Sequence, residues 1–398
     1  MHRSLTRFFS WAAATMALLA AACGGGSSSK TAPQPAAPAE PSPVVVVAAP
    51  AATEEKPPAP AAIEEKPAAP EPSPAPPPEA KPYREMALVL LDGPPGTWTG
   101  EHGNYPTPVR EVWGAGDVVF AATGDEFLQS NDRGLTWRIV KIPQMAQVLS
   151  VWGTSPDEVW VGSKNVILRS TDRGVTWKTT AVPVNAYYNG FWADDKDAYA
   201  VGSDGVILHS SDRGETWQRQ GESLGLRWLY GVWGTGRDVW AFGDAAPKDG
   251  SWRSTTALVH TKDRGKTWTL VNINAAPLRG ICGTGDGVMH IIDSIGSIHQ
   301  SKDRGKTWTK AHTFGSMELS ALACRGKSEI FVGGRNRTFQ HSLDGGKTWT
   351  DELAAQNMWT KLAYSMVDTI FALPSGEVFV GGEGVYSPSP TGTLFRRR

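Results

Sequence analysis

The sequence has little of what nucleic-acid binding, metal binding or membrane spanning requires. Lysine and arginine nearly balance aspartate and glutamate, at a formal net charge of −1, and no Lys/Arg stripe stands out along the chain. This balance argues against a nucleic-acid partner. No His-rich metal spacing and no phosphate-binding loop appear, so we expect neither a metal nor a cofactor. The apolar run from Phe8 to Leu19 is too short for a typical membrane-spanning helix.

Residues 1–22 have the order of a signal peptide, with a positively charged start, an apolar stretch and small residues at the end. Cys23 follows at once, which resembles a bacterial lipoprotein signal. The resemblance implies cleavage before Cys23 and acylation of its thiol. Ala20 stands where such signals usually have Leu, and an ordinary secretion signal is the alternative. Gly24 replaces the Asp that often retains lipoproteins in the inner membrane, so we expect the outer membrane.

Residues 23–83 lack the composition of a folded domain. They are rich in Pro, Ala, Ser and Glu, and they contain no aromatic residue before Tyr83. Such a segment cannot bury a core, and we expect an extended, partly polyproline tether. The remaining residues, 84–398, are long enough for one closed domain.

One phrase recurs six times in residues 84–398. It first reads Ser130-Asn131-Asp132-Arg133-Gly134-Leu135-Thr136-Trp137, and it returns about every 40 residues. Each copy follows a short β-branched run and ends in a polar, strand-like stretch, which predicts strand, tight turn, strand. Its aspartates are Asp132, Asp172, Asp212, Asp263, Asp303 and Asp344, and its tryptophans are Trp137, Trp177, Trp217, Trp268, Trp308 and Trp349.

The chemistry of the phrase predicts a structural role. The aspartate can accept backbone N–H bonds within the turn, and the glycine two residues later suits a positive φ. One carboxylate per turn, with the turns far apart, is a poor cage for a hard cation. We interpret the arginine that follows the aspartate as a solvated turn residue.

The phrase is similar to the Asp-box, or BNR repeat, whose pattern is Ser-x-Asp-x-Gly-x-Thr-Trp. Such boxes occur in sialidases, xyloglucanases, sortilin ectodomains and photosystem II assembly factors. The resemblance implies a β-propeller in which the box is a structural hairpin turn, usually on the face away from the ligand. It implies almost nothing about activity.

A second repeated phrase indicates the number of blades. Its leading position is occupied by Trp113, Trp152, Trp192, Trp233, Cys282, Cys324 and Phe371. Seven units of four short antiparallel strands predict an all-β, seven-bladed propeller, with six or eight blades as alternatives. Residues 86–91 predict one further strand that closes the ring beside the last blade.

Cys282 and Cys324 fall at the same repeat position, on the predicted innermost strands of adjacent blades. An oxidising compartment permits a disulfide between them. Cα atoms more than about 7 Å apart cannot be bridged, so two small buried residues in place of tryptophan are the alternative.

Catalytic constellations are not evident. No arginine triad of the sialidase kind can be assigned, and glycosidases generally need two opposed carboxylates. Asp157, Asp197, Asp238 and Glu329 recur at one repeat position, which indicates turn residues instead of an acid–base pair.

The face opposite the boxes is predicted to collect aromatic, arginine and asparagine side chains, which interfaces favour. They come from loops 183–190, 221–230, 244–256 and 350–361. The candidate partner-binding residues are Tyr187, Tyr188, Arg227, Trp228, Tyr230, Trp252, Arg253 and Trp359.

The sequence therefore predicts a monomeric, lipid-anchored envelope protein without catalytic activity, whose propeller is a protein-binding or assembly platform. Photosystem II assembly factors are the nearest analogy. The alternative is a carbohydrate-binding protein or a diverged glycosidase.

Overall fold

The computed structural model describes residues 86–87, 98–384 except 106, 125, 143–144, 146, 247–254, 285, 316, 337 and 353–363, and residues 392–397. All of them belong to one compact unit, Pro76–Arg398. The predicted signal peptide, Cys23 and the tether lie outside the described residues. None of the helical segments in the described part is long and apolar enough to cross a membrane.

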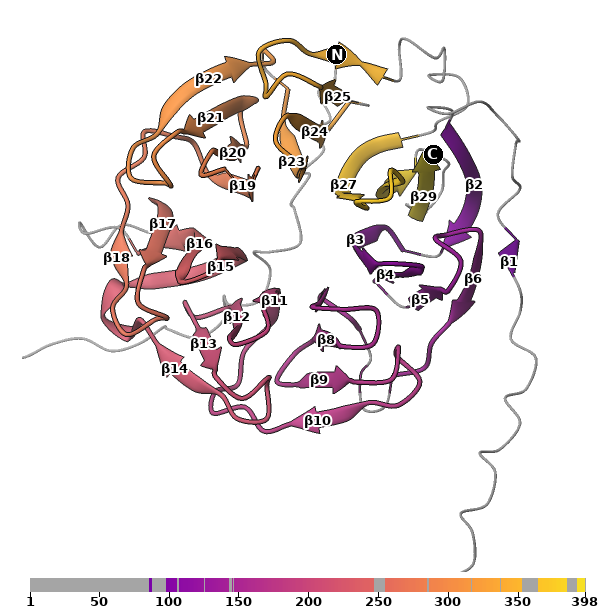
Figure 1. The fold of residues 1–398 in the computed structure, drawn as a ribbon, viewed down its shortest axis with the longest axis horizontal. Coiled ribbons are helices and arrows are strands. Elements are labelled where there is room, and N and C mark those ends of the chain that lie inside the picture. The colour runs from indigo at the N-terminus through magenta and orange to yellow at the C-terminus, as the bar shows by residue number, and fades with distance from the viewer. Residues whose placement is uncertain are drawn as a thin grey trace, which may run out of the picture. The chain divides into compact units, whose positions relative to one another are not determined.

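Seven antiparallel sheets form a ring (Figure 1), which confirms the predicted seven-bladed propeller. Blade 1 contains β3 (Val109–Ala115), β4 (Val118–Thr123), β5 (Phe127–Ser130) and β6 (Thr136–Ile139). Blade 2 contains β7 (Ser150–Gly153), β8 (Val159–Gly162), β9 (Ile167–Ser170) and β10 (Lys178–Thr180). Blade 3 contains β11 (Tyr188–Ala193), β12 (Ala198–Gly202), β13 (Ile207–Ser210) and β14 (Gln218–Gln220).

The other four blades follow the same order from the inside outward. Blade 4 contains β15 (Leu226–Thr235), β16 (Asp238–Ala245), β17 (Thr255–Thr261) and β18 (Thr269–Leu270). Blade 5 contains β19 (Leu278–Gly283), β20 (Met289–Asp293), β21 (Ser297–Ser301) and β22 (Thr309–Thr313). Blade 6 contains β23 (Leu319–Arg325), β24 (Glu329–Gly334), β25 (Phe339–Ser342) and β26 (Thr350–Asp351). Blade 7 contains β27 (Tyr364–Ala372), β28 (Val378–Gly384), β29 (Gly392–Arg397) and β2 (Trp98–Tyr105).

The ring is closed by β2, which pairs with β29 and completes blade 7. Our expectation that residues 86–91 form the closing strand is wrong. The short β1 (Met86–Ala87) pairs instead with β6, on the outer edge of blade 1. In the intact boxes the fourth strand begins at the Thr-Trp pair or just after it. Likewise β2 begins at Trp98, which ends the box-like sequence Asp92-Gly93-Pro94-Pro95-Gly96-Thr97-Trp98.

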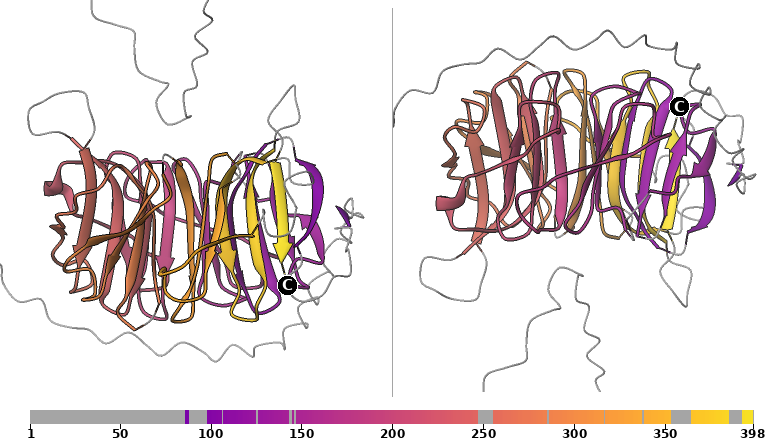
Figure 2. Two further views of the ribbon diagram at one scale, coloured as in Figure 1. Left: turned by 90° about the horizontal axis from the view of Figure 1, so that it is seen from above. Right: turned by 90° about the horizontal axis from the view of Figure 1, so that it is seen from below.

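The seven blades leave two opposite faces, seen from the edge in Figure 2. The turn between first and second strands and the box turn between third and fourth strands share one face, which we call the box face. The turns between second and third strands and the loops leading to the next blade share the other, which we call the loop face. This division follows from the antiparallel order of every blade.

A bulge interrupts the inner strand of six blades near the loop face. The register shifts by one residue at Arg110, Asn189, Tyr230, Arg279, Ser320 and Asp368. A bulge leaves its extra residue outside the ladder and re-aims its side chain. These six positions therefore differ in chemistry while sharing one place in the blade.

Beyond the bulges, toward the box face, aromatic rings connect the inner strands of neighbouring blades. Trp113 lies so close to Gly153 of the next blade that an added Cβ would come within 2.3 Å of its ring. Trp233 approaches Gly283 in the same way, at 2.4 Å. Glycine within a strand permits this close approach, so the rings span the gaps between blades.

Between blades 5 and 6 a disulfide takes the place of such a ring. It joins Cys282 and Cys324, whose Cα atoms lie 5.7 Å apart. We had expected the two cysteines to occupy equivalent positions, and this is wrong. Cys282 is the third residue after the bulge at Arg279, whereas Cys324 is the fourth after the bulge at Ser320. Successive side chains point to opposite faces of a strand, so this offset turns Cys324 toward Cys282.

Candidate functional site

The six box turns share one hydrogen-bond pattern. In the first, the Ser130 hydroxyl accepts a bond from the Gly134 N–H at 2.7 Å. Asp132 Oδ1 accepts from the Thr136 N–H at 2.8 Å, and the Thr136 hydroxyl donates to Asp132 Oδ2 at 2.6 Å. Corresponding bonds recur in the other five boxes. Both carboxylate oxygens are thus engaged inside the turn.

Donors in the turn also set the charge state of the box aspartates. Bonds from the Thr267 hydroxyl and N–H lower the pKa of Asp263 to about 2, because each favours the charged carboxylate. Among the described residues, no group of three or more His, Cys, Asp or Glu could hold a metal ion. The box turns are built as structural elements.

Box arginines are more constrained than we predicted. Each has a left-handed backbone, with φ of 58° at Arg133, and Gly345 takes this position in the sixth box with φ of 76°. Arg133 pairs with Glu377 of blade 7 at 3.4 Å, and Arg264 pairs with Asp197 of blade 3 at 3.2 Å. Both side chains are partly exposed turn residues, as predicted, and their ion pairs also connect their blades to the preceding ones.

The carboxylates in the turns between first and second strands are also engaged within their blades. Asp197 lies 2.7 Å from His209 Nε2, and Asp238 lies 2.9 Å from His260 Nε2. Glu329 lies 3.0 Å from His341 Nε2. Each pair links a turn to the third strand, which fits the turn role expected from their repeat position.

On the loop face, two candidate residues stack on each other. The rings of Tyr187 and Trp228 lie with centroids 6.0 Å apart and planes 26° apart. Lys164 Nζ lies 5.3 Å from the centroid of the Tyr187 ring. Tyr187 is 38% exposed, and Arg227 beside Trp228 is also exposed. We call these four residues the aromatic patch.

Backbone bridges hold the aromatic patch together across three blades. Lys164, in the β8–β9 turn, pairs with Tyr187, and Ser203, in the β12–β13 turn, pairs with Trp228. The Ser203 hydroxyl accepts from the Tyr187 N–H at 3.0 Å. The Arg227 carbonyl accepts from the Gly205 N–H at 2.9 Å. The patch is consequently fixed before any partner binds, which lowers the entropy cost of binding.

The other candidate residues have different surroundings. Tyr188 is fully buried and its hydroxyl donates to the Val184 carbonyl, so it is wrong as a partner-binding residue. It begins β11, and its side chain points into the core because side chains alternate along a strand. Tyr230 is half-buried, and its hydroxyl donates to Asp244 at 2.6 Å. Three candidates, Trp252, Arg253 and Trp359, lie outside the described residues.

Two inner-strand carboxyls were missed from the sequence. Burial raises the pKa of Glu111 to about 8, although a 2.8 Å bond from the Val151 N–H lowers it. Burial raises the pKa of Asp368 to about 7, with Arg110 acting in the opposite direction. Asp368 lies at a bulge and Glu111 lies beside one. The repeat in the sequence does not show where a strand is bulged, so neither residue stood out.

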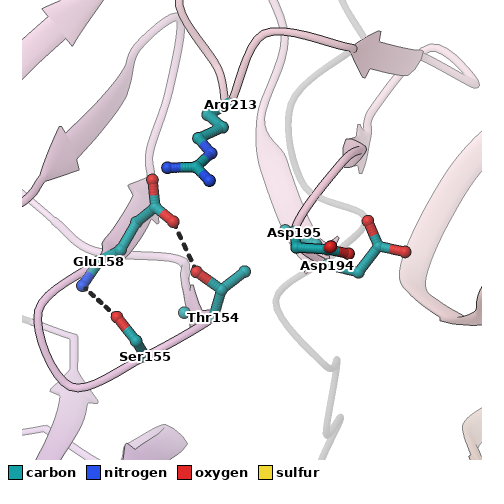
Figure 3. Close-up of a pocket in the computed structure, with 8 residues that line it drawn as sticks. Thr154, Ser155, Glu158, Asp194, Asp195 and Arg213 are labelled. Atoms are coloured by element: carbon teal, nitrogen blue, oxygen red, sulfur yellow. Dashed lines mark hydrogen bonds between the residues drawn. The ribbon is translucent and has the colours of Figure 1, made fainter.

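A hollow of about 430 Å³ opens on the box face between blades 2 and 3 (Figure 3). Its charged lining consists of Glu158, Asp194, Asp195 and Arg213. Glu158 accepts a bond from the Thr154 hydroxyl at 2.6 Å and also pairs with Arg169. Since Glu158 is already occupied, the hollow does not present two free opposed carboxylates.

Comparisons with known proteins agree with this architecture. A family model described as photosynthesis system II assembly factor YCF48 matches residues 129–226. The structure of YCF48 bound to D1 peptide is similar, with a TM-score of 0.60, 19% identity, and coverage of 78% of this chain and 97% of that one. YCF48 from Cyanidioschyzon merolae gives 0.57 and 16%, covering 76% and 98%.

The chain is an Asp-box, or BNR-type, propeller similar to this assembly factor. The GH74 enzyme of Niastella koreensis is also similar, with a TM-score of 0.51 and 14% identity, covering 74% of this chain and 43% of that one. No curated protein sequence matches. At such identities the structural likeness shows the fold and not an activity.

One enzyme-like pattern in the propeller also escaped the sequence reasoning. Residues 221–225 read Gly-Glu-Ser-Leu-Gly, the Gly-x-Ser-x-Gly pattern of many hydrolases. In those enzymes the serine sits on a strand-to-helix turn above a sheet. Here Ser223 lies in η1 (Glu222–Leu224), a 3₁₀ turn on the way from β14 to β15. Within the described residues no histidine or carboxylate bonds to Ser223, so this pattern is a surface turn.

Proposed function

We propose that this chain is a non-catalytic envelope lipoprotein whose propeller is a protein-binding or assembly platform. Acylation of Cys23 would anchor it, with the outer membrane as its location, and residues 23–83 would hold the propeller away from the lipid. The order of residues 1–22 and the composition of the tether support this part. The propeller acts as a monomer in this proposal, because its ring closes on its own strands.

The observation that carries the proposal is the aromatic patch. Tyr187 and Trp228 form a stacked, partly exposed pair with a lysine and an arginine at its edges. Trp, Tyr and Arg dominate the energetics of protein interfaces, because large rings bury much area at low entropy cost. The similar YCF48 structure with D1 peptide supports a protein or peptide as the ligand class.

The experiment is a capture assay from native envelopes with residues 76–398 as bait, since this unit contains every strand of the ring. Trp228→Ala and Tyr187→Ala are the test variants. Val175→Ala is the control, because Val175 is 68% exposed on the box face. A specific envelope protein should be retained by wild type and control and lost with both test variants. Equal retention by all four would contradict the proposal, provided that thermal melts show them folded.

A carbohydrate-directed function is the second candidate, and the inner-strand carboxyls favour it. A carboxyl with a pKa near 7, such as Asp368, has the protonation behaviour of a glycosidase acid. Purified propeller should then release sugar from envelope glycans, and Asp368→Asn should abolish the release. Absence of any hydrolysis, with glycan still retained on the column, would reduce this candidate to glycan binding.

A further inference from the structure

The box face of the propeller has two electrostatically different halves. In blades 1 to 3 most of the cations are paired: Arg133 with Glu377, Arg173 with Asp117, and Lys178 with Glu215 at 2.5 Å. Lys196 and Arg213 are the exposed cations of these box-face turns without an ion pair within the described residues. In blades 4 to 6 a set of exposed cations has no ion pair within the described residues. This set, which we call the basic arc, consists of Arg237, Lys262, Lys266, Lys302, Arg304, Lys306, Lys327 and Lys347.

The turns that carry the basic arc are tied to one another on the same face. The Arg304 N–H bonds to the Gly287 carbonyl at 3.2 Å, which joins the box of blade 5 to its inner turn. The Gly345 N–H bonds to the Ser328 carbonyl at 2.8 Å, which does the same in blade 6. Gln300 Nε2 donates to the Gly345 carbonyl at 3.4 Å and links the two blades. The cations thus stand on adjoining rigid turns.

Neighbouring carboxylates neutralise this half only in part. Asp263, Asp303 and Asp344 are engaged by their own box turns. Asp286 accepts bonds from the Thr284 hydroxyl at 2.6 Å and the Val288 N–H at 3.0 Å. Two further carboxylates of these turns, Asp238 and Glu329, already pair with His260 and with Arg325 and His341. Eight unpaired cations thus stand beside six carboxylates, and an excess of positive charge remains on the three adjoining blades.

We propose that the basic arc docks the propeller on a membrane surface of anionic lipid headgroups. Six of its eight members are lysine, which acts as a point charge and lacks the bidentate fork that arginine offers to single phosphates. Each Lys or Arg close to an anionic bilayer strengthens binding roughly fivefold without a shaped pocket. Leu343, 69% exposed at the blade 6 box, adds an apolar side chain that can enter the headgroup layer.

Other polyanions fit the arc less well. Single-stranded nucleic acids are bound by exposed aromatic platforms, and the large exposed apolar side chain beside the arc is Leu343, which is aliphatic. Docking through the box face would also leave the aromatic patch turned away from the lipid and open to a partner. This inference rests on the proposed envelope location, but it concerns a separate face of the propeller.

The test is co-sedimentation of residues 76–398 with vesicles of phosphatidylcholine, with and without phosphatidylglycerol. This unit lacks Cys23, so lipid attachment cannot contribute. Lys302→Glu/Lys306→Glu is the test variant, and Lys141→Glu/Arg335→Glu makes the same change in net charge on the loop face, outside the aromatic patch. The test variant should weaken binding to anionic vesicles by roughly thirtyfold or more, because two attractive charges are lost and two repulsive ones are added, with little effect from the control pair. Raised salt should release the wild type.

Three results would overturn the docking proposal: no binding to anionic vesicles, equal binding to neutral vesicles, or equal loss with both variant pairs. Binding to a nucleic acid or an acidic protein in place of vesicles would assign the arc to that ligand instead. Partner capture by the Lys302→Glu/Lys306→Glu variant separates the two proposals. It should remain intact if the aromatic patch is the platform, whatever the vesicle result.

Discussion

The box turns and the inner-strand bulges both recur around the ring, but they differ in sequence and in electrostatics. The box repeats nearly the same residues six times, and its donors lower the pKa of its aspartates. The bulged position holds arginine, asparagine, tyrosine, serine or aspartate in different blades. Beside it, burial raises the pKa of Glu111. A residue repeated in every blade serves the scaffold, whereas a shared position with changing chemistry can distinguish one part of the ring from another.

The largest expected effect concerns the one place where the inner strands are joined covalently. Cys282→Ser/Cys324→Ser should lower the free energy of unfolding by about 4 kcal/mol, because the disulfide closes a loop with a sequence separation of 42 residues. Chemical denaturation of the oxidised wild type and the double variant measures it. If the two unfold at the same denaturant concentration, the bond contributes nothing to ring stability.

Removing a box aspartate should have the next largest effect. Asp263→Ala removes the acceptor of bonds from Thr261 and Thr267, and we expect a loss of about 2 kcal/mol. Lys266→Ala, in the same turn, should change stability by less than about 0.5 kcal/mol, since its side chain is exposed. Thermal or denaturant melts of both variants test whether the stability of the turn depends on the repeated aspartate. Similar losses of stability in both variants would contradict a special role for the aspartate.

The box aspartates and the buried inner-strand carboxyls should have opposite effects on how folding stability changes with pH. The folded pKa of Asp263, about 2, lies below the unfolded value of about 3.9, so its contribution is present above pH 4 and is lost as the pH falls toward 2. The folded pKa of Glu111, about 8, lies above the unfolded value of about 4.3. The native state then binds the extra proton, and stability falls as the pH rises from about 4 to 8.

The Glu111→Gln variant tests the predicted loss of stability at high pH. Glutamine keeps an oxygen for the Val151 N–H but cannot ionise. We expect the variant and the wild type to be equally stable at pH 5, and the variant to be more stable by at least about 1 kcal/mol at pH 8. Denaturant titrations at the two pH values measure the difference. A constant offset at both values would show that Glu111 does not titrate in this range.

The smallest effect is expected at the box arginine. Arg304 has φ of 59°, a left-handed conformation that side chains rarely adopt, and the sixth box already has Gly345 there. Arg304→Gly should raise the free energy of unfolding by about 0.5 kcal/mol, because relief of backbone strain exceeds the added freedom of the unfolded chain. Arg133→Gly also loses the contact with Glu377 and should gain less. A lower melting temperature for Arg304→Gly would contradict the strain argument.

The sequence predicted the scaffold well because a 40-residue period with a fixed turn phrase leaves few architectures. The sequence did not predict which of two neighbouring side chains faces the core or a partner, because that depends on a shift of one residue in strand register. Tyr188 enters the core while Tyr187 stays at the surface, and Cys324 faces Cys282 only through an offset of one position. The basic arc was not recognised for another reason, since its cations come from three blades that are about 40 residues apart in the chain. Folding into a ring brings them to one half of one face.

The most direct test of the platform is site-specific photo-cross-linking in intact envelopes. A photoreactive amino acid replaces Tyr187 on the loop face in one variant, and Val175 on the box face in the other. Our account predicts one defined protein adduct from position 187 and none from position 175. The same adducts from both positions, or none from position 187 in a folded protein, would contradict the assignment of the aromatic patch as the binding surface.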